Sequence, residues 1–272
     1  MRLLIHLFFR PMRIFEMKRL FVFTVLGFLV AISPLAHSNA DIIDVVIPGA
    51  AIGTEGGSAE GTALGAFSNT VHTVYNESIL LEAGLRPGDT LTGLSFRLNG
   101  TNTAPIWTVE DYQIRLATSL NSAGFLDDVF ANNRGDDYTV VRSGELTYDG
   151  SEYSTSDTGP HPFGEELTFD TTFTYNGGDL LLEYTHTLID TDNNSPGTQE
   201  VSRADFFTGL DDGAGGLFAQ TYFGGGFDAE ERTFNASNGR ATVVRFSAVP
   251  EPGSAALLLG IGMIGVLRRR KM

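Results

Sequence analysis

The sequence predicts an all-β domain, built as an antiparallel β-sandwich or jelly roll, between two apolar terminal segments. Several segments alternate apolar and polar residues with a period of two, the pattern of half-buried strands. Turns rich in Gly, Asp and Asn separate them, and glycine accounts for 32 of the 272 residues. There is no cysteine, so the domain must be held by its core alone, for which about 210 residues suffice.

We divide the chain into residues 1–40, 41–248 and 249–272. The first part has the layout of a secretory signal peptide, with basic residues before an apolar run from Leu20 to Ile32. Small residues precede a cleavage site between Ala40 and Asp41, where signal peptidase is expected to cut. The alternative is a permanent N-terminal membrane anchor. Met17, directly before Lys18-Arg19, is an alternative start to Met1.

The clearest strands of the middle part are 94–98, 111–116 and 242–246, where every second residue is apolar. Residues 168–175 and 180–187 alternate in the same way on either side of Asn176-Gly177. Because an Asn-Gly step favours positive φ, we predict a β-hairpin over 168–187. Four polar or glycine-rich stretches are expected to be irregular: 48–66, 149–166, 190–200 and 209–226. The first of them is expected to precede any stable strand.

Charge excludes one class of partner for the middle part. Residues 41–250 hold nine arginines, no lysine and 31 carboxylates, a formal charge of −22. Such a surface repels nucleic acid and anionic lipid headgroups, and it attracts divalent cations. We therefore expect no nucleic-acid partner.

Acidic loops offer the oxygen ligands that Ca²⁺ prefers. The segment Asp190-Thr191-Asp192-Asn193-Asn194 resembles the opening of a Ca²⁺ loop, with Asp190, Asp192 and Asn194 as ligands, although Ser195 stands where such loops have Gly. Further acidic pairs lie at 127–128, 136–137 and 211–212. The alternative is that Asp and Asn simply form turns on an exported surface.

No catalytic centre can be identified. His72, His161 and His186 have no metal-ligand spacing, and the many carboxylates show no pattern that separates an acid from a nucleophile. A sugar-stacking platform is an alternative use of the aromatic residues, which more often pack the core. The candidates are Trp107, Tyr112, Tyr138, Tyr148, Tyr153 and Tyr222.

The last 24 residues hold three elements in a fixed order. Pro250-Glu251-Pro252 comes first, then an uncharged run from Ala255 to Leu267, then the cluster Arg268-Arg269-Arg270-Lys271. The run is shorter than the roughly 20 residues that span a bilayer comfortably, but the cations are a strong cytoplasmic stop signal. The alternative is a buried apolar helix at the end of a soluble domain.

This tail resembles a PEP-CTERM sorting signal. The resemblance implies that Pro250, Glu251 and Pro252, with Arg268, Arg269 and Arg270, are recognised by an exosortase, a membrane-embedded cysteine protease. It further implies anchoring in the inner membrane with the bulk of the chain outward, then delivery to the cell surface or to an extracellular matrix rich in exopolysaccharide. The middle part also resembles β-rich domains of unassigned activity that carry this tail.

We therefore expect an exported, non-enzymatic protein of the cell surface or matrix. The alternative is a carbohydrate-binding module, lectin-like and Ca²⁺-assisted. A secreted hydrolase is a third class, for which the sequence offers no support. No cofactor other than Ca²⁺ is expected.

Overall fold

The computed structural model describes residues 41–60, 63, 68–100, 107–148, 159–187, 204–233 and 237–251. The predicted signal peptide and C-terminal apolar helix lie outside these ranges. Within them, no helix is long and apolar enough to cross a membrane. The strands, in chain order, are β1 Ile43–Ile47, β2 Gly57–Glu60, β3 Asn69–Tyr75, β4 Thr90–Phe96, β5 Trp107–Val109, β6 Tyr112–Thr118, β7 Thr139–Arg142, β8 Leu146–Tyr148, β9 Leu167–Thr174, β10 Leu180–His186, β11 Ala204–Thr208, β12 Ala219–Gly225, β13 Ser237–Asn238, β14 Arg240–Thr242 and β15 Val244–Val249.

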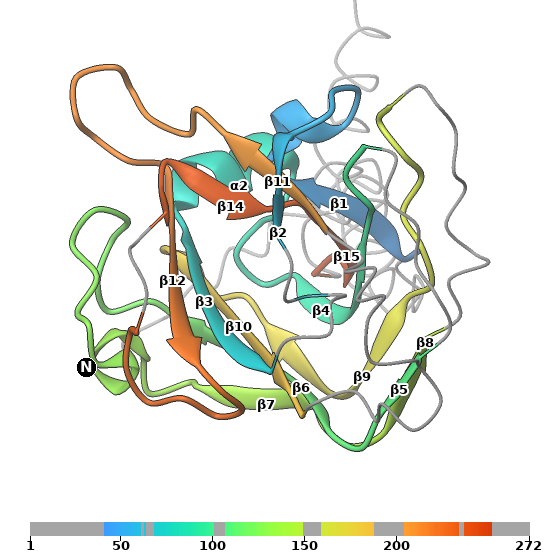
Figure 1. The fold of residues 1–272 in the computed structure, drawn as a ribbon. Coiled ribbons are helices and arrows are strands. Elements are labelled where there is room, and N and C mark those ends of the chain that lie inside the picture. The colour runs from blue at the N-terminus through green and yellow to red at the C-terminus, as the bar shows by residue number, and fades with distance from the viewer. Residues whose placement is uncertain are drawn as a thin grey trace, which may run out of the picture. The chain divides into compact units, whose positions relative to one another are not determined.

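All strand pairings are antiparallel, which confirms the predicted class (Figure 1). The six-stranded sheet has the order β13-β12-β3-β10-β6-β7, and the four-stranded sheet has the order β1-β15-β4-β9. A three-stranded sheet, β14-β11-β2, and the pair β5-β8 complete the described domain.

The two large sheets share one apolar core. Phe96 of β4 meets Tyr184 of β10 edge to face, with ring centroids 5.5 Å apart. The hydroxyl groups of Tyr75 and Tyr184 both bond to Thr242, at its carbonyl oxygen and its Oγ1, each over 2.8 Å. Buried aliphatic residues from both sheets fill the space between. This face-to-face packing is that of a β-sandwich.

The predicted hairpin over 168–187 is wrong, although both of its strands exist. β9 pairs with β4 in one sheet, while β10 lies between β3 and β6 in the other. Gly177 and Gly178 do have positive φ, at 96° and 81°, but their turn carries the chain from one sheet to the other. β10 is buried at every position, and a strand with two neighbours has no free edge for β9.

Two of the stretches expected to be irregular contain strands. Residues 48–66 contain β2, which pairs with β11. β1 precedes this stretch and pairs along its length with β15, so the arm predicted before the first strand begins after it. The glycine-rich stretch 209–226 ends in β12, which pairs with β3 from Ala219 to Gly225. Its small residues fit where neighbouring segments approach closely, and a Cβ on Gly224 would lie 2.6 Å from that of Ala229.

The last predicted strand is divided. Thr242 ends β14 in the three-stranded sheet, and Val244 begins β15 in the four-stranded sheet. One α-helix, α2, occupies Glu77–Ala83 in the described residues and ends at Gly84 in the left-handed conformation. Two short 3₁₀ helices, η2 Gly49–Ala51 and η3 Phe130–Asn133, lie in connections.

Candidate functional site

The proline-glutamate motif follows the last strand without a linker. Val249 still pairs with Thr90 of β4, Pro250 is half-buried, and Glu251 is exposed. Pro252, Arg268, Arg269 and Arg270 lie outside the described residues. At the other end of the chain, Asp41 is exposed two residues before β1, and Ala40 lies outside the described residues.

Acidic side chains in the described loops accept hydrogen bonds from their own turns or from neighbouring segments. Asp212 Oδ1 accepts hydrogen bonds from the backbone N–H groups of Ala214 and Gly216, each over 2.8 Å, and these bonds lower the pKa of Asp212. Asp137 accepts bonds from the N–H and hydroxyl groups of Thr118. In the part of the chain that the structure describes, no three metal-ligating side chains gather. The predicted ligands Asp190, Asp192 and Asn194 lie outside it.

A buried carboxylate on the outer face of the six-stranded sheet accepts bonds from four side chains of the domain. Glu183 of β10 stands directly opposite His72 of β3 on one side and Arg115 of β6 on the other. His72 Nδ1 lies 2.9 Å from Glu183 Oε2, and Arg115 Nη1 lies 2.7 Å from Oε1. The side chain of Glu183 is fully buried. The register of three strands therefore places a histidine, a carboxylate and an arginine in one row.

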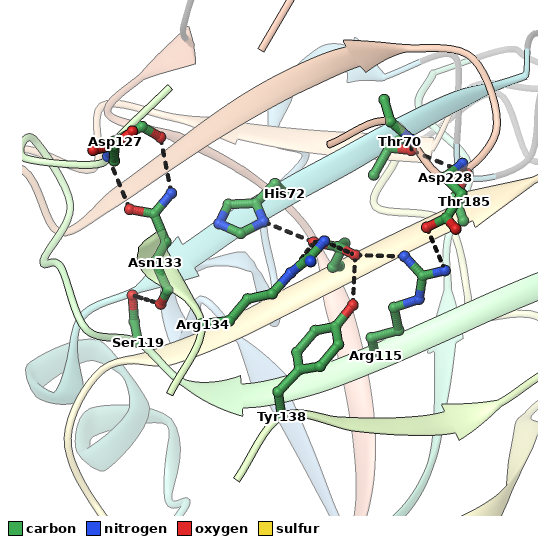
Figure 2. A network of polar contacts seen from close by, with 12 residues as sticks. Thr70, His72, Arg115, Ser119, Asp127, Asn133, Arg134, Tyr138, Thr185 and Asp228 are labelled. Atoms are coloured by element: carbon green, nitrogen blue, oxygen red, sulfur yellow. Dashed lines mark hydrogen bonds and ion pairs between the residues drawn. The ribbon is translucent and has the colours of Figure 1, made fainter. Parts of the chain in front are cut away.

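The segment between β6 and β7 closes this row from outside. Arg134 Nη2 donates to both oxygens of Glu183, over 2.9 and 2.8 Å, and the hydroxyl of Tyr138 donates to Oε1 over 3.0 Å. The Arg134 guanidinium also covers the Tyr138 ring, 4.5 Å from its centroid. Figure 2 shows His72, Arg115, Arg134 and Tyr138 converging on one point.

A fifth group extends this Glu183 cluster toward solvent. Asp228, which is exposed, accepts from Arg115 Nη2 over 2.7 Å. On the opposite side, Phe130 of η3 stacks on the His72 ring, with centroids 4.6 Å apart. A small apolar cluster adjoins this contact: Val74, Ala117, Leu126, Phe130, Leu181 and Tyr222. The β6–β7 segment thus covers the outer face of the sheet with both polar and apolar contacts.

Electrostatics keep Glu183 ionised. Burial by itself would raise its pKa, but the hydrogen bond and charge of His72, the charge of Arg134 and the hydrogen bond from Arg115 outweigh that effect and lower the pKa to about 2. Burial also raises the pKa of Tyr138, and the adjacent Glu183 raises it further. A carboxylate that stays charged and whose two oxygens already accept bonds from four side chains is a poor proton donor and a poor nucleophile.

A second buried ion pair holds the segment between β1 and β2. Arg97 Nε donates to Asp205 Oδ2 over 2.7 Å, and its two Nη groups donate to the carbonyl oxygens of Ala51 and Thr54, each over 2.6 Å. Asp205 Oδ1 also accepts from the N–H of Gly56 over 3.0 Å. Both side chains are buried. Like Glu183, Asp205 therefore joins separate segments of the domain through buried hydrogen bonds.

The histidines and aromatic residues mostly have structural contacts. His186 stacks on Tyr112, and His161 Nε2 bonds to the carbonyl oxygen of Gly100. Tyr112, Tyr148 and Tyr222 are buried, which contradicts their use in a sugar platform. Tyr138 is half-buried beneath Arg134. The side chains of Trp107 and Tyr153 lie outside the described residues.

The Glu183 cluster was not predicted from the sequence. Glu183 directly follows the apolar run Leu180-Leu181-Leu182, and Arg115 lies on the less apolar face of β6. A charged residue within an otherwise apolar strand is the signal that could have indicated a buried ion pair, but the partners depend on a register that alternation within one strand does not reveal.

The comparisons with known proteins support the sorting signal that was predicted from the tail. Residues 248–271 match the PEP-CTERM protein-sorting motif. No curated protein and no solved structure matches the chain. The motif defines a class, namely exported proteins that an exosortase sorts and processes. This chain carries that motif directly after a β-rich domain.

Proposed function

We propose that the domain is a non-enzymatic component of the cell surface or of an extracellular matrix, delivered there after an exosortase has acted on its tail. The inner membrane holds the chain through its C-terminal apolar run until then, and the final surroundings include exopolysaccharide. The observation that carries this proposal is the sorting motif, whose Pro-Glu-Pro begins at the residue after β15.

The chemistry of the interior supports a structural role. The two buried carboxylates with the most partners, Glu183 and Asp205, are each bound to arginine and to further donors of the domain. Such groups fix strand register and connections. The absence of lysine and a charge of −22 over 41–250 also suit a hydrated exterior that stays soluble.

The test compares the native protein with a variant in which Pro250, Glu251 and Pro252 are all alanine. The wild type should lose the residues beyond the motif and leave the inner membrane, while the variant keeps its full mass there. Glu165→Ala, at an exposed carboxylate, is the control and should behave as wild type. If wild type and variant both keep Arg268 to Arg270, processing does not occur and the proposal fails.

A carbohydrate-binding module is the second candidate, and one side chain favours it. Phe125, in the segment that covers the six-stranded sheet, is 81% exposed, and an exposed aromatic ring can stack on a sugar face. A glycan array should then show saturable binding that Phe125→Ala removes, tested with and without Ca²⁺ and beside Trp107→Ala. If binding is unchanged in both variants, Phe125 and Trp107 do not bind the sugar.

A further inference from the structure

The strand before the sorting motif cannot be detached without opening a sheet. β15 lies between two partners and pairs with β1 from Ile43↔Ala248 to Ile47↔Val244. On its other edge it pairs with β4 as far as Val249↔Thr90. Val244, Phe246 and Ala248 are buried. A protease that binds the tail therefore meets an intact strand up to Val249.

The motif also rests against a neighbouring turn. Gly88, at φ +97° in the turn from Leu85 to Asp89, faces the side chain of Glu251. A methyl group on Gly88 would lie 2.5 Å from Glu251 Oε2 and 3.1 Å from its Cβ, so any larger residue must displace Glu251.

The turn itself is firmly held. Gly88 N–H donates to the carbonyl oxygen of Tyr175 over 2.7 Å, and buried Asp89 accepts from the N–H of Arg86 over 2.7 Å. The side chain of Glu251 therefore lies beside a fixed part of the domain.

Further exposed residues lie at the same end of the sheet. Since Ile43 pairs with Ala248, Ile42 lies beside the end of β15, and it is 64% exposed. Arg86 and Pro87 of the turn are exposed as well. An enzyme that binds Pro250 and Glu251 must contact this surface, because no linker separates the motif from β15.

We propose that the turn Leu85–Asp89 is a second recognition element for the sorting exosortase. Packing against Gly88 restricts the positions open to Glu251, so less conformational freedom is lost when the protease binds the motif. Gly88 is a positioning residue in this scheme, and it acts through Glu251. The inference rests on the processing proposed above.

The experiment measures the rate of tail removal in the native cell by pulse labelling, with the product identified by its mass. Gly88→Ala should slow removal several-fold because it displaces Glu251. Gly84→Ala is the matched control: Gly84 also has a left-handed backbone, at φ +104°, but a Cβ there meets no atom within 4 Å. The two variants should melt at similar temperatures, and Gly84→Ala should be processed at the wild-type rate.

A linker separates positioning from general damage to the fold. Insertion of Gly-Ser-Gly-Ser between Val249 and Pro250 detaches the motif from the turn. Processing should slow, and Gly88→Ala should then have no additional effect. Equal rates for wild type, Gly88→Ala and the linker variant would overturn the inference, as would a linker that accelerates removal. A wild type that is never processed would instead show that the proposed function has failed.

Discussion

Glu183 shows how one buried charge can fix the relation of three strands and a connection. Its partners come from β3, β6 and the β6–β7 segment. An ion cluster of this kind is not always more stabilising than an apolar equivalent, but removing one member leaves the others buried and uncompensated.

Glu183→Gln should therefore lower the free energy of unfolding by about 3–5 kcal/mol. Gln keeps the shape and removes the charge that Arg115, Arg134 and His72 face. Urea denaturation of the domain measures the loss. Glu165→Gln, at an exposed carboxylate, should change stability by less than about 0.5 kcal/mol. A Glu183→Gln variant as stable as this control would mean that the cluster contributes little.

The same substitution predicts a dependence on pH. The pKa of Glu183 falls from an ordinary 4.5 in the unfolded chain to about 2 in the fold. Its ionisation therefore stabilises the fold fully above about pH 4.5, and this stabilisation disappears as pH falls toward 2. The gap between wild type and Glu183→Gln should shrink by about 3 kcal/mol over that window. A gap that stays constant from pH 5 to 2 would contradict the assignment.

At the scale of elements, alternation identified strands that have one buried and one more polar face. Residues 94–98 and 111–116 overlap β4 and β6, and 168–175 overlaps β9, whose buried and exposed positions largely alternate. Pairing could not be predicted in the same way. β10 is buried on both faces, and it joins β3 and β6, which are distant in sequence.

The Glu183 site escaped prediction for the same reason, since its residues come together only through strand register. Phe125 was missed because it lies in a connection without periodicity. The tail, by contrast, could be identified because its three parts are contiguous in sequence.

The Arg97–Asp205 pair gives a prediction about the segment from Ala51 to Gly56. Arg97→Met removes a cation from buried Asp205 and donors from two carbonyl oxygens, and should cost about 3–5 kcal/mol. In the Arg97→Met variant, the amide hydrogens of this segment should also exchange with solvent faster than those of β15. Adding Asp205→Asn, which removes the unpaired charge but keeps an acceptor for Gly56, should cost less than the sum of the single changes. Strict additivity would mean that the two residues act independently.

At the scale of the molecule, few cations remain to balance the acidic surface. Of the nine arginines in residues 41–250, Arg97 and Arg115 are buried, and Arg134 turns inward to Glu183. The excess of carboxylates is therefore concentrated on the outside, where like charges repel one another.

Salt should stabilise the domain as a consequence. Raising NaCl from about 0.01 M to about 0.5 M shortens the screening length severalfold and should raise the melting temperature by a few degrees. A fall in the melting temperature would mean that screening of favourable ion pairs dominates.

Ca²⁺ added at matched ionic strength tests the predicted site at Asp190, Asp192 and Asn194. A further rise with Ca²⁺ that Asp190→Asn removes would support that site, and no further rise would contradict it.

The pairing of β1 with β15 has a consequence for the timing of export. β1 opens the domain and β15 closes it, and the two are about 200 residues apart in sequence; among the described strands β1 pairs with β15 alone. A chain that crosses a membrane from its N-terminal end releases β1 early and β15 last. The four-stranded sheet therefore stays incomplete until Val249 has emerged, and the next residue, Pro250, begins the Pro-Glu-Pro of the sorting motif. The fold is therefore completed and the motif presented at nearly the same time. A chain that ends before β15 would give the protease neither a complete domain nor a motif.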